Sequence, residues 1–204
     1  EGGKIVTARK GRLQYEIKIT GRPAHAGSRH IDGRNAIKEM AHQILKIEAL
    51  TDYETGVSCS VGTIEGGTFT NVVPQECVIT VDIRVPDMET GDEIMAIFEG
   101  LEAVDPDCSL EVTGGVDRPA YEKFDGIAKL FDQAKEIAAE IGFDLQDMKT
   151  GGGSDGNFTG ALGIPTLDGL GADGKGAHTH DEFIYYSSLE DRAKLMLGLF
   201  EALD

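Results

Sequence analysis

RLQYEIKIT, residues 12–20, alternates apolar and polar side chains, which is the period of a β-strand with one buried face. This stretch decides the fold, because it is the first of six strands and helices that the apolar spacing predicts over the next hundred residues. Residues 35–50 (NAIKEMAHQILKIEAL) carry apolar side chains at helical spacing. The other elements predicted are strands over 57–64 and 76–85, a helix over 90–104 and a short strand over 109–113.

The resulting order, β-α-β-β-α-β, is the ferredoxin-like pattern. It is complete within residues 10–115, where Gly114 and Gly115 punctuate its end. The sequence therefore predicts an α+β fold class, with this unit as one domain. Residues 1–9 precede the unit as a linker, and residues 116–204 follow it.

Residues 116–204 show a different pattern, in which two predicted helices are separated by glycine-rich loops. An amphipathic helix is predicted over 125–141 with Gly142 as its C-terminal stop, and a closing helix over 187–203 with Ser188 available as its cap. Between them lie glycine-rich loops and one short extended stretch, 164–167. These elements do not make a self-contained layer structure. We infer that part of the core comes from elsewhere and that the chain starts midway through a domain.

Composition excludes several functions. The formal net charge of −17 repels phosphate backbones, so we expect no nucleic-acid binding. No apolar run reaches the length that crosses a bilayer, so no membrane partner is expected. Cys59, Cys77 and Cys108 form no C-x-x-C pair, which indicates a reducing cytoplasm rather than a disulfide framework. Cys59 and Cys77 lie in strand-like runs, as buried structural thiols do.

Two glycine-rich loops carry candidate functional groups. In GAHTHDEF, residues 176–183, His178 suits a metal or acid–base site, although the spacing of His178 and His180 alone favours two solvated histidines in an exposed loop. GGGSDG, residues 151–156, suits an anion cradle built from backbone N–H groups, with a plain turn as the alternative.

Three further candidates lie in the ferredoxin-like unit. His25, in PAHAG, follows a predicted strand end, where a surface histidine is the alternative. Asn71, in TNVVP, lies in a connection that favours asparagine anyway. Arg84, in DIR, has the fork that grips a carboxylate, or forms a surface ion pair.

The order of these motifs is more specific than any one of them. PAHAG, N-x-x-P, D-x-R, GGGSD and GAH-x-x-DE together resemble the zinc aminoacylase and carboxypeptidase family, which includes succinyl-diaminopimelate desuccinylase, acetylornithine deacetylase, tripeptide aminopeptidase and bacterial glutamate carboxypeptidases. The resemblance spans essentially the whole chain. It implies that residues 1–9 are the end of the first half of a catalytic domain and a linker, and that residues 10–115 are a ferredoxin-like dimerisation lid. Residues 116–204 would then be the C-terminal portion of an α/β zinc-hydrolase catalytic domain.

The resemblance also implies roles for individual residues. His178 matches a metal ligand, and Glu1, in EGG, matches the carboxylate ligand that precedes the lid. His25 matches the histidine that reaches the partner subunit's active site and stabilises the oxyanion. Asn71 and Arg84 match residues that hold the carboxylate end of the substrate. The loop that lines the substrate pocket corresponds to Gly152, Gly153, Ser154 and Asp155.

The family's remaining groups belong to its first half: an H-x-D segment with the bridging aspartate, and a Glu-Glu pair with the general base. We identify neither segment in this chain. The hypothesis is a fragment of a di-zinc peptidase or amidohydrolase that is inactive alone, with zinc incompletely bound. Its expected substrates are carboxylate-bearing peptides or N-acyl amino acids, as Arg84 and Arg118 suggest, and a homodimer is expected through the lid. The alternatives are a non-catalytic dimerisation or amino-acid-binding module and a catalytically dead homologue.

Overall fold

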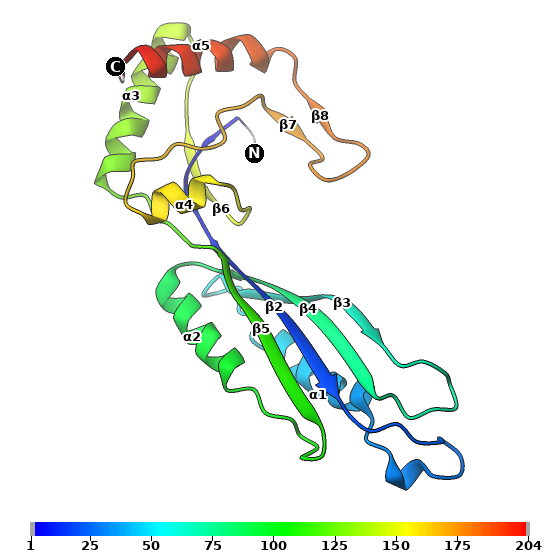
Figure 1. Cartoon of the computed structure of the whole chain (residues 1–204). Coiled ribbons are helices and arrows are strands. Elements are labelled where there is room, and N and C mark those ends of the chain that lie inside the picture. The colour runs from blue at the N-terminus through cyan, green and yellow to red at the C-terminus, as the bar shows by residue number, and fades with distance from the viewer. Residues whose placement is uncertain (1–2, 203–204) are drawn as a thin grey trace. The chain divides into compact units, whose positions relative to one another are not determined.

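The computed structural model describes residues 3–202, which form two compact units (Figure 1). One unit, Gly11–Pro119, is called the lid below. The other, called the split unit, combines residues 3–10 with residues 120–202. The lid is thus inserted between two segments that fold together, although they are distant in sequence.

The lid is a four-stranded antiparallel sheet with two helices on one face (Figure 1). The strand order is β3-β4-β2-β5, so the first and third strands of the unit are its central pair. This confirms the ferredoxin-like prediction. The elements are β2 Gly11–Thr20, α1 Ala36–Glu48, β3 Ser58–Gly66, β4 Glu76–Val85, α2 Met88–Glu99 and β5 Ser109–Arg118, with a short 3₁₀ turn at His30–Asp32.

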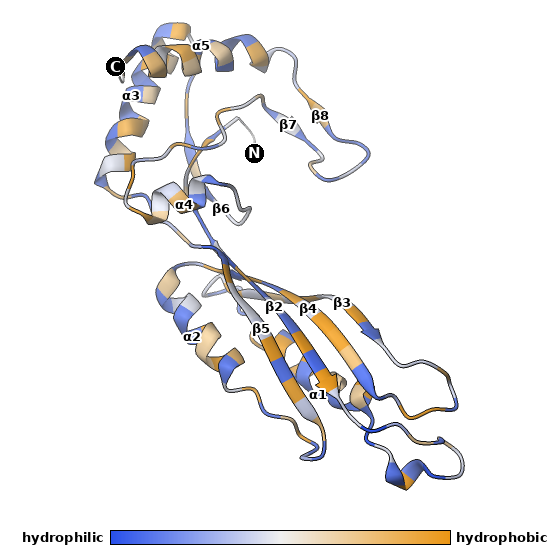
Figure 2. Cartoon of the chain, viewed as in Figure 1, coloured by the Kyte–Doolittle hydropathy of each residue, from blue (hydrophilic) through white to orange (hydrophobic). Residues whose placement is uncertain are grey.

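Alternation in β2 and β4 builds the core of the lid. In both strands buried residues alternate with more exposed ones, and the buried ones pack with α1 and α2 in one core. Hydrophobic and hydrophilic residues alternate along β2 (Figure 2). Tyr15 of β2 stacks on Phe98 of α2, with ring centroids 4.3 Å apart. Asn35 caps α1 by accepting the Lys38 N–H, as expected for asparagine at an N-cap.

Two element ends in the lid differ from the prediction by five residues each. The helix predicted over 90–104 ends at Glu99, where Gly100 follows; further on, the N–H groups of Val104 and Asp105 donate to the side chain of Glu39. The last strand runs on to Arg118 and includes Gly114 and Gly115, which were expected to end it. Both glycines have positive φ, and a Cβ on Gly114 would overlap the Gln14 carbonyl oxygen. Glycine is therefore needed inside this strand, where two backbones approach closely.

The split unit has a parallel strand pair at its centre and helices around it. β1 Ile5–Arg9, with all five residues buried, pairs with β6 Asp147–Thr150. The β1 strand was not predicted, because a strand buried on both faces shows no alternation. The remaining elements are α3 Asp125–Ile141, α4 Gly156–Ala161, β7 Gly174–Lys175, β8 Phe183–Ile184 and α5 Ser188–Ala202.

One helix end in the split unit agrees with the prediction from the sequence, and another differs from it. Gly142 ends α3 with φ +108, as predicted. Ser188, expected as the cap of the last helix, is instead the first residue of α5. Its hydroxyl donates to the Tyr185 carbonyl and accepts the Asp173 N–H, so it fastens the preceding loop rather than the helix end.

Many apolar side chains of the split unit face solvent, and they are called the exposed apolar surface below. Leu162 and Tyr186 are 77% and 86% exposed. Other exposed apolar side chains of the unit are Phe158, Ile164, Phe183, Ile184, Leu197 and Phe200. Exposed apolar area of this extent marks a surface that packs against something else. Among the described residues no helix is long and apolar enough to span a bilayer.

Candidate functional site

One end of the lid brings together two of the residues singled out from the sequence, His25 and Asn71. The loop after β2 lies against the loop before β4 through a bridge between His25 and Val72. Ala26 N–H donates to the Asn71 carbonyl at 2.9 Å, and Val73 N–H donates to the Ala24 carbonyl at 2.9 Å. The backbone thus holds both residues at neighbouring positions, and both are exposed.

The His25 imidazole is held in one tautomer. Its Nδ1 accepts the backbone N–H groups of Gly27 and Ser28, each at 3.1 Å. A nitrogen that accepts two hydrogen bonds carries no proton, so the proton of the neutral ring lies on Nε2. Nε2–H is therefore an outward-facing donor, which is the group needed to stabilise a developing negative charge.

Arg84 lies far from His25 within the lid. It pairs with Ser58 and Arg12 near the β4 end at which the chain enters and leaves the lid, whereas His25 and Asn71 adjoin the Glu76 end. Eight residues of strand separate the two ends, about 27 Å at the usual rise per residue. Arg84 Nε donates to Asp82 Oδ1 at 2.6 Å, and the same carboxylate also accepts from Arg12. One lid therefore does not bring Arg84 together with His25 and Asn71.

The glycine-rich loop before α4 is tied into the split unit by side chains. Ser154 N–H donates to Asn157 Oδ1 at 3.0 Å, and Gly156 N–H donates to Ser154 Oγ at 3.1 Å. Gly152 offers its carbonyl to Arg9 Nη1 at 2.7 Å. Because the N–H groups of Ser154 and Gly156 already have acceptors, they are not free to cradle an anion. The pocket-lining role of Gly153, Ser154 and Asp155 stays a prediction.

Arg9 and Asp168 organise this loop, and sequence reasoning missed both. Arg9 Nε donates to Asp168 Oδ2 at 2.9 Å, and Ser154 Oγ donates to the same oxygen. Burial raises the pKa of Asp168, but hydrogen bonds from Ser154, Gly169 and Arg9 outweigh it and hold the pKa below its ordinary value. The only signal in the sequence was an acid directly after the predicted extended stretch 164–167.

His178 occupies a strained turn between β7 and β8. Its φ of +67 is the one positive value among described non-glycine residues. Thr179 fixes the turn, since its N–H and its hydroxyl both donate to the Gly176 carbonyl, at 3.0 and 2.7 Å. A non-glycine residue in this conformation often serves a functional site.

Residues 3–202 do not make a complete metal site. No group of three or more His, Cys, Asp or Glu side chains in this range is placed to hold a metal ion. Glu1, the other ligand expected from the resemblance, lies outside the described residues. A catalytic zinc usually has three protein ligands, so these residues alone do not fit the metal.

The statement that the chain contains no H-x-D was wrong, because these letters occur inside the lid at His30-Ile31-Asp32. It forms the 3₁₀ turn, where the Asp32 carboxylate pairs with Arg29 at 2.7 Å. The triplet is therefore part of a surface turn rather than of a metal centre.

All three cysteines are buried and free. Burial raises the pKa of the Cys59 thiol to about 11 and also raises those of Cys77 and Cys108. This confirms the interpretation of Cys59 and Cys77 as buried structural thiols and leaves them unreactive as nucleophiles.

Comparison with known proteins identifies this arrangement. Residues 7–101 match the family described as the peptidase dimerisation domain of M20 enzymes. The chain carries the M20 peptidase dimerisation domain. Over its full length it is homologous to the C-terminal half of M20 peptidases, which confirms the resemblance seen in its motifs.

Two curated relatives and one solved structure show the extent of the match. Carboxypeptidase G2 of Pseudomonas sp. (strain RS-16) is 26% identical over 204 residues, covering 96% of this chain and 49% of that protein. Succinyl-diaminopimelate desuccinylase of Cupriavidus taiwanensis is 27% identical, covering 99% and 53%. A tripeptidase from Staphylococcus aureus superposes with a TM-score of 0.83 at 26% identity, covering 100% and 54%.

The chain spans about half the length of the curated M20 relatives that it matches. By their names, these relatives hydrolyse peptide or amide bonds. The structural match to the tripeptidase includes residues of both units of the chain. The lid-end residues His25 and Asn71 fall inside the matched dimerisation domain.

Proposed function

We propose that the chain is the lid and C-terminal part of a metal-dependent peptidase or amidohydrolase, and that it does not hydrolyse substrate alone. The observation that carries this proposal is the pairing of an M20 dimerisation domain with an incomplete ligand set in residues 3–202. The exposed apolar surface of the split unit supports it, because the rest of a catalytic domain would cover that surface. We call the longer protein that would contain both parts the parent protein.

The proposed site draws residues from two copies of the chain. His25 and Asn71 lie at one end of the lid and Arg84 at the other, so a single lid cannot present all three to one substrate. In a homodimer, His25 and Asn71 of one copy serve the site to which the other copy contributes Arg84. Because a homodimer has two-fold symmetry, each of its two sites receives His25 and Asn71 from one copy and Arg84 from the other.

Within that site, His25 donates Nε2–H to the oxygen that becomes negative as the amide is attacked. Its tautomer is set beforehand by Gly27 and Ser28, so no reorganisation is needed when charge develops. Asn71 and Arg84 hold the substrate carboxylate, with Arg84 exchanging part of its bond to Asp82 for the substrate. The loop containing Gly153, Ser154 and Asp155 lines the pocket. The substrates are peptides or N-acyl amino acids with a free carboxylate.

His178 is the proposed metal ligand on this chain, with Glu1 as a second. Zinc, two ions per complete site, is the proposed metal, because neutral imidazole and carboxylate are ligands that suit it. When bound, it would polarise the scissile carbonyl and activate water. The three buried free thiols support a reducing compartment, and we propose the cytoplasm.

The test compares the purified chain with the parent protein. We expect hydrolysis of N-acyl amino acids or dipeptides, together with tightly bound metal by elemental analysis, in the parent protein only. Hydrolysis by residues 1–204 alone would contradict the proposed incompleteness. A parent protein that binds no metal and cleaves nothing would favour a non-catalytic dimerisation or amino-acid-binding module.

A further inference from the structure

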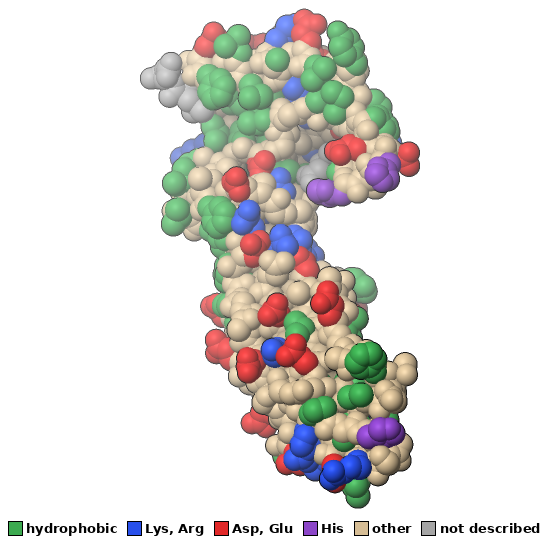
Figure 3. Space-filling view, turned by 45° about the vertical axis from the view of Figure 1, so that its right-hand side comes forward, with side chains coloured by type: hydrophobic (Ala, Val, Ile, Leu, Met, Phe, Trp, Pro, Cys, Tyr) green, Lys and Arg blue, Asp and Glu red, His purple; other side chains and the backbone are tan. Residues whose placement is uncertain are grey.

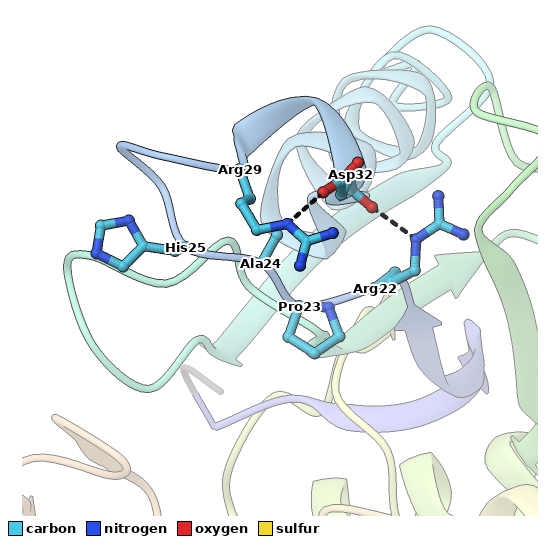
Figure 4. Close-up of a pocket in the computed structure, with 6 residues that line it drawn as sticks. All are labelled: Arg22, Pro23, Ala24, His25, Arg29 and Asp32. Carbon is cyan, nitrogen blue, oxygen red and sulfur yellow. Dashed lines mark hydrogen bonds and ion pairs between the residues drawn. The ribbon is translucent and has the colours of Figure 1, made fainter.

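A cationic cavity lies beside His25 at the tip of the lid. It has a volume of about 570 Å³ and is lined by Arg22, Pro23, Ala24, His25, Arg29 and Asp32 (Figure 4). Two arginines and one aspartate give these six residues a formal charge of +1 with histidine neutral, in a chain whose net charge is −17. The space-filling view shows Lys and Arg side chains gathered near a histidine at this end of the lid (Figure 3).

Both arginines are anchored through Nε and leave their outer nitrogens available. Arg22 Nε donates to the Asp32 carbonyl at 2.6 Å, and Arg29 Nε donates to the Asp32 carboxylate at 2.7 Å. No hydrogen bond joins the Nη groups of either arginine to another residue in the range 3–202. Each guanidinium is thus held by one bond; the outer nitrogens of Arg29 point toward Arg22 and Pro23, and those of Arg22 point away from Asp32 (Figure 4).

The backbone beneath the arginines is fixed. Arg22 and Arg34 exchange two backbone hydrogen bonds, of 3.0 and 2.9 Å, and Asp32 N–H donates to the Arg29 carbonyl at 3.0 Å. Gly33 packs so closely on Val73 that a Cβ there would come within 2.8 Å of it. Binding an anion therefore costs little further ordering of the chain, which is the benefit of preorganisation.

We propose that Arg22 and Arg29 form a binding site for a carboxylate, separate from the end of the lid that holds Arg84. The ligand class is a small dicarboxylate or the acidic side chain of an amino-acid derivative. Planar guanidinium forks match planar carboxylates with two parallel hydrogen bonds, and Asp32 is the only carboxylate that competes among the lining residues. The inference goes beyond the proposed function and concerns binding by the chain as it is, whether or not the parent protein is a hydrolase.

The test is a titration of the chain with glutarate at constant ionic strength, followed through the Arg Nε–H and the Gly27 and Ser28 amide NMR signals. We expect saturable shifts in the millimolar range, confined to the tip of the lid. Arg29→Gln and Arg22→Gln should each weaken binding about tenfold, the loss expected for one charge-assisted contact. Lys46→Gln removes an exposed positive charge on α1 that does not line the cavity, so it should leave the affinity unchanged.

A second variant guards against a merely structural effect of the arginine substitutions. Asp32→Asn removes the competing negative charge, while the amide oxygen can still accept the Arg29 Nε–H, so it should tighten glutarate binding several-fold. Binding weakened by Asp32→Asn as much as by the arginine variants would overturn the proposal, as would shifts unaffected by any of them. Inorganic phosphate binding as tightly as glutarate would overturn the assignment to carboxylates, and glutaramide should not bind.

Discussion

Arg9 and Asp168 form an ion pair of 2.9 Å between residues 159 positions apart, and this pair joins the segment before the lid to the segment after it. Arg9 is 6% exposed, and Asp168 Oδ2 accepts from Ser154 as well. The glycine-rich loop is therefore held by a buried charge network rather than by regular secondary structure. Networks of this kind are costly to break, because the remaining charge is left buried.

We expect Asp168→Asn to destabilise the split unit by about 2 kcal/mol, since the Arg9 guanidinium loses its counter-charge in a buried place. Hydrogen exchange measured by mass spectrometry should show faster exchange across residues 150–157 and no change in the lid. Asp132→Asn, which makes the same charge change on an exposed face of α3, should exchange like the unmodified chain. Equal protection in both variants would show that the network does not hold the loop.

The stability of the lid should depend on pH through Glu39, which is 2% exposed. Its carboxylate accepts the Val104 and Asp105 N–H groups and the Gln43 amide. Burial raises the pKa of Glu39, but these hydrogen bonds have a larger, opposite effect, and the pKa lies below its ordinary value of 4.5. A folded-state pKa below the unfolded one adds stability that is present above the unfolded value and is lost as the pH falls through the folded one.

Urea denaturation followed by circular dichroism should therefore show a free energy of unfolding that falls below about pH 4.5, the region set by that pKa. Glu39→Gln should destabilise the lid at neutral pH by about 2 kcal/mol, because an amide NH₂ then faces buried donors. It should also flatten the pH dependence. Glu93→Gln, on the exposed side of α2, is the control, and an equally steep pH profile in both variants would refute the role of Glu39.

Gly114 and Gly115 provide a matched pair for testing backbone strain in β5. Both have positive φ, +139 and +146, but only a Cβ on Gly114 would meet the backbone of β2. We expect Gly114→Ala to cost about 2 kcal/mol more than Gly115→Ala, the scale of steric overpacking. Denaturation curves of the two variants measure the difference directly. Equal losses would mean that φ, rather than the approach of Gln14, sets the requirement.

The lid could be predicted from the sequence because each of its elements carries a local signal. Alternation in residues 12–20 and helical spacing in residues 35–50 identify elements without tertiary information. The boundaries that failed depend on long-range contacts: at the far end of the helix predicted over 90–104, the N–H groups of Val104 and Asp105 bond to Glu39 instead of to helix carbonyls. Gly114 resembles a strand end in sequence, but the approach of β2 makes it part of the strand.

The candidate site was predictable in its residues and not in its geometry. His25 and Asn71 were identified by motif order, yet the bridge that joins them and the tautomer of His25 depend on backbone contacts that no local pattern encodes. Arg9 and Asp168 were missed because a buried ion pair between distant segments has no periodicity. The cavity of Arg22 and Arg29 was missed because single surface arginines are ordinarily solvated.

The most direct test of the account is subunit mixing in the parent protein. His25→Ala and His178→Ala should each abolish most of the hydrolysis when present in both copies of the dimer. After exchange of equal amounts, half of the dimers pair one variant with the other, and one of their two sites then has both histidines. The account predicts recovery of about a quarter of the unmodified activity, because two-fold symmetry gives each dimer two equivalent sites. A mixture that exchanges subunits and stays inactive, or a His25→Ala dimer that keeps full activity, would contradict a site shared between two lids.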